Sequence, residues 1–527
     1  MAINATDDAS RYLAFLERLN AGQTEAERDW LTLEFSLEWL AESVQELVWI
    51  AAVPHWFDQD FLAALLGSTP NEGDFATLLD LSFVEIYPER GHAVHERTRK
   101  LLLDRLWQNE TDRYRTLSTR AAAYCERRDQ RDTAWRVEGI YHWLVAEPEN
   151  GTLRLIDTGW EWQNPPHFAY DKVEALARAT REHLDAGRLA ERGKAWTLFW
   201  EAHLDKIYSR YKAAQKKLLQ IQLAPDRDPY TAANCLKALG DVHLGLSEPG
   251  EARARYEQAL PIYQAIGDRL GEVNCLKALG DVHLRLSEPG EARARYEQAL
   301  PIYQAIGARL GEANCLQALG DVHLGLSEPG EARARYEQVL PIYQAIGSRL
   351  GEANCLKALG DVHLGLSEPG AARARYEQAL PIYQAIGDRL GEANCLKALG
   401  DVHLGLSESG AARARYEQAL PIYQAIGDRL GEANCLKSSG DYYREQMDSE
   451  AARRQYEKAA ALFDLIGCRE GEAECLEGFA KLHEALRDRV MAIEAWEKAA
   501  TLYETSGMLK RANSCTDAAK RLGDLNL

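Results

Sequence analysis

Histidine recurs at intervals of 40 residues in this chain, and imidazole nitrogens at a fixed spacing could in principle bind a metal ion. A zinc ion needs its nitrogen ligands about 2.0–2.1 Å away, whereas equivalent positions on stacked helical repeats lie on the order of 10 Å apart. One ion therefore cannot reach two of these histidines, and Tyr443 in the same register favours an aromatic packing position. We predict packing roles and no metal site for His243, His283, His323, His363 and His403.

Cysteine follows the same interval and could in principle form disulfides or act as a nucleophile. A disulfide needs two Cα atoms under about 7 Å apart, which the spacing of repeats does not allow. Nucleophilic catalysis needs one special cysteine with a base and an orienting group, and a residue repeated eight times is not special. We predict buried packing roles and no catalytic residue for Cys235, Cys275, Cys315, Cys355, Cys395, Cys435, Cys475 and Cys515; Cys125 and Cys468 lie outside the series.

The shared interval identifies a repeat of 40 residues. Five nearly identical copies run from about 231 to 430, two diverged copies end near 510, and residues 511–527 form a last helix. A period of this length indicates a stacked array. The near identity of the copies indicates recent duplication, and an array of equal surfaces suits a repetitive or multivalent ligand.

Each copy contains two predicted helices. In the second copy, apolar residues at three- and four-residue spacing predict helices over 270–286 and 291–306, separated at 287–290. Gly307 is placed to end the second helix. A proline inside each second helix must kink the helix, make it start afresh, or shorten it. These prolines are Pro261, Pro301, Pro341, Pro381 and Pro421.

The repeat resembles a tetratricopeptide repeat of the lengthened, kinesin-light-chain-like kind. Leu239-Gly240 matches the Leu-Gly pair of that family, Leu236 and His243 stand at its Trp and Tyr positions, and Ala252, Tyr256 and Ala259 match the small-aromatic-small pattern of its second helix. The resemblance implies an all-α, right-handed superhelical solenoid. It also implies that the first helix of each repeat lines a concave groove.

The groove-facing positions implied by this resemblance carry asparagine, lysine or glutamine, and aspartate. Asparagine offers donors and an acceptor, so a row of asparagines could hold the backbone of an extended peptide. Lysine and aspartate four residues apart could instead pair with each other, which would leave a neutral, solvated surface without a ligand. The predicted partner-binding residues are Asn234, Lys237, Asp241, Asn274, Lys277, Asp281, Asn314, Gln317, Asp321, Asn354, Lys357, Asp361, Asn394, Lys397, Asp401 and Asn434.

Residues 1–150 carry no repeat and form the first of four predicted domains. The pattern predicts helices, then short strands at 83–87 and 92–95, then another helix. This order resembles the helical linker and winged-helix region of the signalling NTPases called STAND proteins, which often place a repeat solenoid next. His95 lies where that family has a nucleotide-contacting histidine. Residues 151–230 read as an irregular connector with a degenerate capping repeat, 231–510 as the seven repeats, and 511–527 as a capping helix.

The phosphate-binding loop of such NTPases is missing. It needs the pattern G-x-x-x-x-G-K-[ST], and the nearest string, Arg192-Gly193-Lys194-Ala195, lacks the second glycine and the hydroxyl. We therefore expect no bound cofactor and no enzymatic activity. His95 is then expected to be an ordinary packing or surface residue, and an NTPase or effector would be a separate chain.

The formal net charge of −19 disfavours nucleic acid and anionic membrane surfaces as partners. The chain shows neither a signal peptide nor an apolar run long enough to span a bilayer, so a cytoplasmic location is expected. These observations predict a non-enzymatic scaffold or sensor that binds a protein or peptide in the groove, in signalling or defence. The alternative is a DNA-binding regulator that uses the winged helix, because arginines cluster between Arg97 and Arg136, although acidic residues are interleaved with them.

Overall fold

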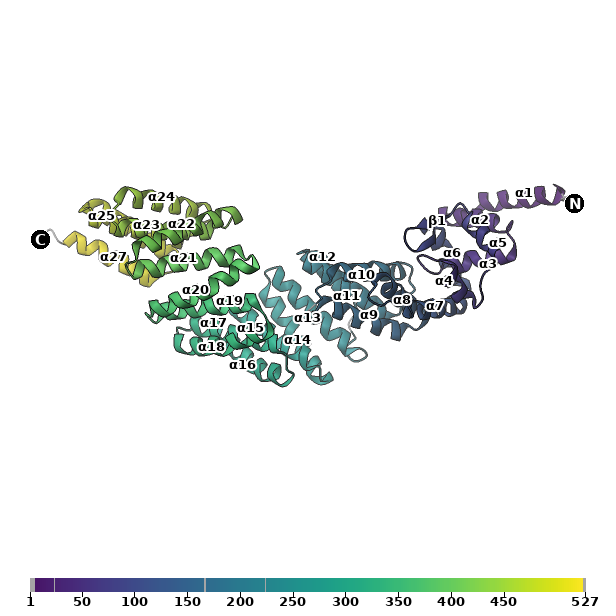
Figure 1. Cartoon of the computed structure of the whole chain (residues 1–527), viewed down its shortest axis with the longest axis horizontal. Coiled ribbons are helices and arrows are strands. Elements are labelled where there is room, and N and C mark those ends of the chain that lie inside the picture. The colour runs from purple at the N-terminus through teal and green to yellow at the C-terminus, as the bar shows by residue number, and fades with distance from the viewer. Residues whose placement is uncertain (1–4, 23, 165–166, 223, 525–527) are drawn as a thin grey trace. The chain divides into compact units, whose positions relative to one another are not determined.

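The computed structural model describes residues 5–22, 24–164, 167–222 and 224–524. These residues form 27 helices and one two-stranded sheet (Figure 1), which confirms the predicted all-α class. The chain divides into two compact parts, Met1–Cys275 and Leu276–Leu527, and the division falls inside α15 (Arg269–Arg285). The last three residues of the predicted capping helix lie outside the described residues.

The elements of the first part are α1 (Ala5–Ala21), α2 (Glu25–Leu37), α3 (Glu42–Ala51), α4 (Gln59–Leu66), α5 (Glu72–Leu79), β1 (Val84–Tyr87), β2 (Gly91–Val94), α6 (Glu96–Asn109), α7 (Thr111–Glu126), α8 (Thr133–Ala146), α9 (Pro148–Gln163), α10 (Tyr170–Asp185), α11 (Glu191–Ile207), α12 (Tyr211–Leu218), α13 (Pro229–Gly245) and α14 (Pro249–Ile266). Those of the second part are α16 (Pro289–Ala305), α17 (Arg309–Gly325), α18 (Pro329–Ile346), α19 (Arg349–Gly365), α20 (Pro369–Ile386), α21 (Arg389–Gly405), α22 (Ser409–Ile426), α23 (Arg429–Glu445), α24 (Ser449–Leu465), α25 (Arg469–Ala485), α26 (Arg489–Thr505) and α27 (Leu509–Asp524).

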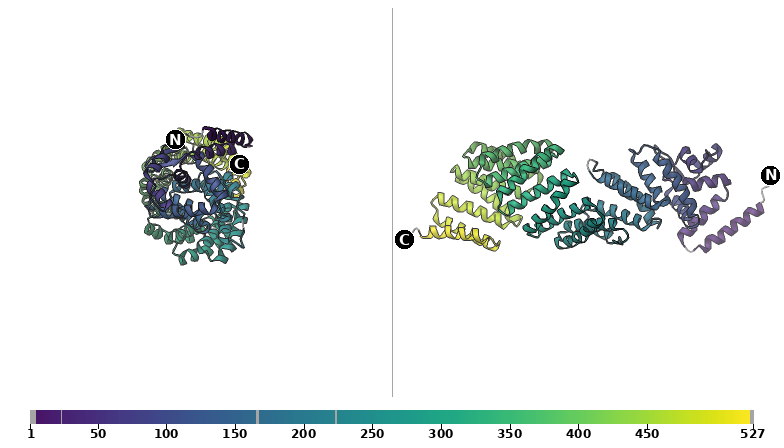
Figure 2. Two further views of the ribbon diagram at one scale, coloured as in Figure 1. Left: turned by 90° about the vertical axis from the view of Figure 1, so that its right-hand side faces the viewer. Right: turned by 90° about the horizontal axis from the view of Figure 1, so that it is seen from below.

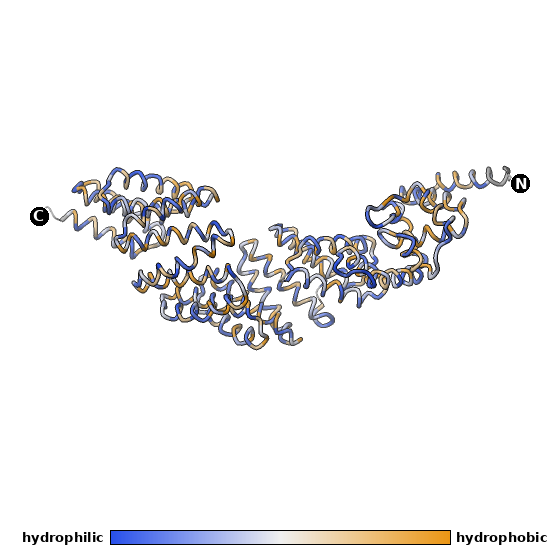
Figure 3. The backbone as a smooth tube through the Cα atoms, in the orientation of Figure 1, coloured by the Kyte–Doolittle hydropathy of each residue, from blue (hydrophilic) through white to orange (hydrophobic). Residues whose placement is uncertain are grey.

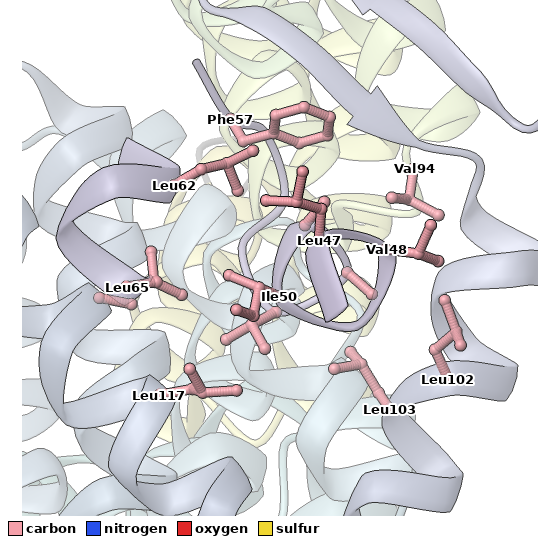
Figure 4. Close-up of a cluster of buried hydrophobic side chains, with 14 of the residues drawn as sticks. Leu47, Val48, Ile50, Phe57, Leu62, Leu65, Val94, Leu102, Leu103 and Leu117 are labelled. Atoms are coloured by element: carbon pink, nitrogen blue, oxygen red, sulfur yellow. The ribbon is translucent and has the colours of Figure 1, made fainter. Parts of the chain in front are cut away.

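The N-terminal residues show the predicted order of helices, hairpin and helix. Strands β1 and β2 pair antiparallel, with Val84 opposite Val94 and Tyr87 opposite Gly91. Leucine, valine and isoleucine side chains from α3, α4, α6 and α7 converge with Val94 on one buried core (Figure 4). The hairpin thus contributes one apolar end to this core, while the side chain of Ile86 points to solvent and is 79% exposed.

Each repeat consists of a first helix, here called A, and a second helix, called B. Repeat one is α13 and α14, repeat two α15 and α16, and so on to repeat seven, α25 and α26. Within a repeat the two helices lie side by side (Figure 2). Apolar and polar residues alternate along every helix of the array (Figure 3), as expected when one side of each helix is buried.

A glycine of helix A allows the two helices of a repeat to approach closely. In repeat four, a Cβ atom added at Gly360 would lie 2.5 Å from the ring of Tyr376, and Tyr376 is fully buried. The same arrangement recurs in repeats one to six, and it explains in physical terms why the Leu-Gly pair and the tyrosine occur together. The other pairs are Gly240 with Tyr256, Gly280 with Tyr296, Gly320 with Tyr336, Gly400 with Tyr416, and Gly440 with Tyr456.

The B helices run without a break through their internal prolines. Helix α20, for example, continues from Pro369 to Ile386 across Pro381. The alternatives of a helix that restarts or ends at the proline are therefore wrong. Gly307 follows the end of α16 with φ of 68°, which confirms the predicted glycine stop in a left-handed conformation.

Candidate functional site

One face of each A helix carries an asparagine, a lysine or glutamine, and an aspartate, because these positions are three and four residues apart. In α19 these residues are Asn354, Lys357 and Asp361. We call the equivalent positions of repeats one to five the A-helix face. Its side chains are half-buried or exposed, except for Asn234, which is buried.

Buried tyrosines of helix B hold the aspartates of this face, a contact that the sequence analysis missed. The hydroxyl of Tyr376 donates to Asp361 Oδ1 at 2.6 Å, and that of Tyr416 donates to Asp401 at 2.8 Å. Burial, followed by the neighbouring aspartate, raises the pKa of Tyr376 and Tyr416, so these hydroxyls stay protonated and donate. The 15-residue separation between the partners could have suggested the contact once the helix pairing was known.

A second tyrosine of helix B holds the asparagines. The hydroxyl of Tyr383 donates to Asn354 Oδ1 at 2.7 Å, and the hydroxyl of Tyr423 donates to Asn394 Oδ1 at 2.7 Å. The Oδ1 atom of each asparagine therefore already accepts a hydrogen bond. The Nδ2 group takes no part in this contact and is a potential donor to a ligand. In repeat one, Asn234 also donates its amide to the Tyr230 carbonyl at 2.9 Å.

Lysine pairs with aspartate in four of the five repeats, as the alternative interpretation of the sequence allowed. The Nζ–Oδ2 distance is 2.7 Å in the pairs Lys277–Asp281, Lys357–Asp361 and Lys397–Asp401, and 3.2 Å between Lys237 and Asp241. Such partly exposed pairs contribute only about 0–1 kcal/mol to stability. An ammonium group has three donors, so the pairing leaves each lysine able to bind a further acceptor.

Repeat three differs from the other four. Gln317 replaces lysine, and the single hydroxyl proton of Tyr343 is shared between Gln317 Oε1 and Asn314 Oδ1, each at 2.8 Å. Asp321 accepts from Tyr336 at 2.5 Å and forms no ion pair with any described residue. Burial raises the pKa of Asp321 above its ordinary value, against the hydrogen bond from Tyr336, which lowers it. The A-helix face therefore carries one uncompensated carboxylate.

Beyond repeat five the pattern changes. Asn434 lies half-buried on α23, but Lys437 there donates to Glu474 of the next repeat at 2.6 Å. Glu474 also receives Arg511 at 2.9 Å. The end of the array is thus stabilised by charge pairs between helices, whereas the lysines of the A-helix face pair within one helix; Asp241 also pairs with Lys206 of α11 at 2.9 Å.

The repeated histidines contact a glutamate across the turn between helices A and B. His363 Nδ1 lies 2.6 Å from Glu368 Oε2, and the Glu368 backbone N–H donates to the His363 carbonyl at 2.8 Å. The other repeated histidines bind the equivalent glutamates. Within the described residues, no group of three or more potential ligands could hold a metal ion.

The repeated cysteines are buried between helices. Cys355 Sγ lies 3.2 Å from the Tyr336 carbonyl, and burial raises the pKa of Cys355 to about 12. Cys468 is only partly buried. The repeated thiols therefore lack both the exposure and the thiolate fraction that reactivity requires.

This arrangement predicts the outcome of thiol labelling at neutral pH. Ellman's reagent is expected to modify about one thiol per native chain within minutes, at Cys468, and all ten only after denaturation, because burial suppresses the other thiolates. The measurement is the absorbance of released thionitrobenzoate, with Cys468→Ser as the control that should abolish the fast phase. Several fast thiols in the Cys468→Ser chain would contradict the burial of the series.

A buried cluster of charges joins the N-terminal residues to the connector helices. His55 Nδ1 lies 2.7 Å from Glu138 Oε2, and His55 Nε2 lies 3.0 Å from Glu182 Oε2. Arg99 Nη1 donates to Glu182 at 2.8 Å. Both ring nitrogens of His55 face carboxylates, and this arrangement favours the charged form of the ring. His95 lies apart from this cluster: its side chain is exposed and it precedes α6.

Four of the ten arginines between Arg97 and Arg136 form ion pairs within the described residues: Arg97, Arg99, Arg113 and Arg136. Arg113 lies 2.9 Å from Glu110, and Arg136 lies 2.6 Å from Glu161. Arg97 contacts Asp29 and lies 2.9 Å from Glu25.

The comparisons with known proteins agree with the repeat architecture. Residues 230–305, 272–345, 312–385 and 352–425 match the family described as tetratricopeptide repeat, and residues 404–515 match the soluble NSF attachment protein family. No curated protein matches the chain. No described helix is long and apolar enough to cross a membrane.

Two solved structures illustrate the similarity. The apo form of RapI is 12% identical, with a TM-score of 0.56, over 68% of this chain and 98% of that one; at this identity the match shows a shared fold. A signal transduction ATPase of the STAND class with a tetratricopeptide repeat sensor, from Pyrococcus horikoshii, is 15% identical, with a TM-score of 0.48, over 87% of this chain. The chain spans 66% of the length of that ATPase.

Proposed function

Because the chain is a tetratricopeptide-repeat protein, we propose that it is a non-enzymatic scaffold or sensor that binds an extended peptide or protein segment on its A-helix face. The observation that supports the proposal best is the asparagine series. Each asparagine of repeats three to five is fixed through its oxygen by a buried tyrosine, at 2.7–2.8 Å. A side chain that is already ordered loses little entropy when it binds a ligand.

The chemistry of this face suits a peptide backbone. Fixed asparagine amides can donate to backbone carbonyls, and lysines paired with aspartate retain further donors. A face of paired charges does not repel a partner that carries both signs. The overall charge of −19 disfavours a nucleic acid partner.

We assign the remaining parts of the chain to supporting roles in this proposal. Residues 1–150, whose His55 and Arg99 pair with Glu182 of α10, would relay or dock the binding event, in signalling or defence. Residues 151–230 and 511–527 would cap the array of residues 231–510. An NTPase or effector chain acting in trans is the expected second partner.

Selection of peptides from a phage-displayed library of random 12-residue sequences on the full chain tests the proposal. The triple variant Asn314→Ala, Asn354→Ala, Asn394→Ala is expected to bind a selected peptide at least tenfold more weakly by fluorescence polarisation, because each lost hydrogen bond costs about 0.5–1.5 kcal/mol and 1.4 kcal/mol is tenfold.

A matched control separates binding from stability. The triple variant Tyr343→Phe, Tyr383→Phe, Tyr423→Phe removes the same internal hydrogen bonds but keeps the asparagine amides. It should retain binding within about threefold if the amides contact the peptide. Equal losses in both variants, or no enriched peptide at all, would count against the A-helix face as a binding site.

A further inference from the structure

One carboxylate distinguishes repeat three within the second part of the chain. In repeats two, four and five, lysine and tyrosine occupy both oxygens of the aspartate, as Lys357 and Tyr376 do for Asp361. In repeat three Tyr336 occupies Oδ1 of Asp321. No described residue donates to Oδ2: Gln317, which stands where the other repeats have lysine, carries no charge and contacts Tyr343 through its Oε1.

The exposure of this position leaves the free oxygen within reach of a partner. Asp321 and Asn314 are exposed, as is Asp361 of repeat four, whereas Asp281 and Asp401 and the asparagines of repeats four and five are half-buried. An approaching cation would stabilise the charged form of this carboxyl group, which forms no ion pair with any described residue.

We propose that Asp321 is the specificity-determining residue of the A-helix face and binds the side chain of a lysine or arginine in the bound peptide. This inference rests on the proposed function. The cation of the peptide would take the place that the lysine ammonium fills in repeats two, four and five, so the ligand would complete the pair that Gln317 leaves open.

The position of Asp321 would also determine the register in which a peptide binds. Repeats two to five are nearly identical, so a peptide backbone could bind in several registers shifted by one repeat. Successive repeats lie on the order of 10 Å apart, and an extended peptide advances about 3.3 Å per residue, so one repeat corresponds to about three residues. A single unpaired carboxylate makes one of these registers preferable and fixes the position of the basic residue.

Three single variants of the full chain test the inference with the same random 12-residue library. Gln317→Lys restores the pair found in the neighbouring repeats and should fold normally. Peptides selected on the unmodified chain are expected to share a lysine or arginine at one position. They should bind Gln317→Lys at least tenfold more weakly, and selection on Gln317→Lys should not enrich that basic residue.

The other variants make the test specific for charge. Asp321→Asn keeps an acceptor for Tyr336, and it should weaken binding as much as Gln317→Lys and reduce the salt dependence of the affinity. Lys357→Gln frees Asp361 as a second site, and selection on it should enrich a second basic residue about three positions from the first.

The outcomes separate the inference from the proposed function. If the unmodified chain enriches peptides without a shared basic residue, or if Gln317→Lys binds the selected peptides equally well, the role of Asp321 is wrong while peptide binding stands. If the unmodified chain enriches no peptide, the proposed function fails and the inference fails with it.

Discussion

Replacing Glu138 with alanine is expected to lower the free energy of unfolding of the N-terminal residues by about 3–5 kcal/mol, the usual cost of removing one partner from a buried ion pair. The Glu138 carboxylate accepts from the His55 backbone N–H at 2.9 Å, from His55 Nδ1 at 2.7 Å and from His142 Nε2 at 3.1 Å. Its side chain is only 2% exposed. The substitution would leave a charged histidine and a buried backbone donor without their acceptor.

Tryptophan fluorescence measures this effect selectively. Of the 12 tryptophans, 11 lie between Trp30 and Trp200, and only Trp496 lies in the array. With a urea dependence of about 1–3 kcal/mol/M, the fluorescence midpoint should fall by at least about 1 M. Glu174→Ala breaks an exposed pair with Arg178 and should cost only about 0–1 kcal/mol. A similar midpoint for Glu138→Ala and Glu174→Ala would show that the cluster contributes little.

The pH dependence provides a second readout of the same cluster. Burial and Arg99 oppose the charged form of His55, but the carboxylates of Glu138 and Glu182 outweigh them and raise its pKa. A raised pKa stabilises the fold fully below the unfolded value of about 6.5, and this contribution is lost as pH rises through the folded pKa. Burial lowers the pKa values of His142 and His183, so their opposite effect is confined below about pH 6.5. The midpoint of the unmodified chain should therefore fall as pH rises above about 6.5, and Glu138→Ala should reduce this slope.

This cluster also marks the limit of what the sequence could predict. Glu138 is separated from His55 by 83 residues, and no spacing or periodicity connects them. The helices of the repeats and the hairpin follow from local periodicity, and they were predicted within a few residues. Which face of α8 and α10 meets the residues after α3 depends on tertiary packing, which a single sequence does not reveal.

The A-helix face shows the same limit at shorter range. The i, i+4 spacing of Lys357 and Asp361 suggested their pairing. The tyrosine hydroxyls that hold Asp361 and Asn354 were missed, because Tyr376 and Tyr383 were interpreted only as apolar packing residues of helix B. A tyrosine buries its ring and still needs a partner for its hydroxyl, so a polar residue opposite each tyrosine was the available signal.

The polar contacts at the turns between repeats were missed for a related reason. Glu392 is 8% exposed; it pairs with Arg389 at 2.5 Å and accepts from Gln384 at 3.1 Å. The Gln and Arg positions lie on either side of the turn after α20. The spacing of Gln384 and Arg389 therefore predicts a shared contact with Glu392 only when the direction of the turn is known.

Replacing Gly360 with alanine is expected to destabilise repeat four by about 1–3 kcal/mol, although alanine is intrinsically the better helix former by about 1 kcal/mol. The added Cβ atom would lie 2.5 Å from Tyr376 Cε1 and 2.7 Å from Cζ. The ring cannot easily move, because it is fully buried and its hydroxyl is bonded to Asp361. Hydrogen exchange of peptides from α19 and α20 measures the effect locally, as suits an array whose repeats can open separately.

The sign of the effect should reverse when the ring is removed. Tyr376→Ala alone should cost about 3–5 kcal/mol, in the range for large buried aromatic side chains. Adding Gly360→Ala to that variant should stabilise it, because the steric conflict is gone and only the helix preference remains. Gly370→Ala is the matched control, since nothing lies within 4 Å of a Cβ atom there. If Gly360→Ala destabilises both the unmodified chain and the Tyr376→Ala variant, the glycine is required for the backbone conformation. If the effect reverses in the Tyr376→Ala variant, the close approach of helix B is the reason for the Leu-Gly pair.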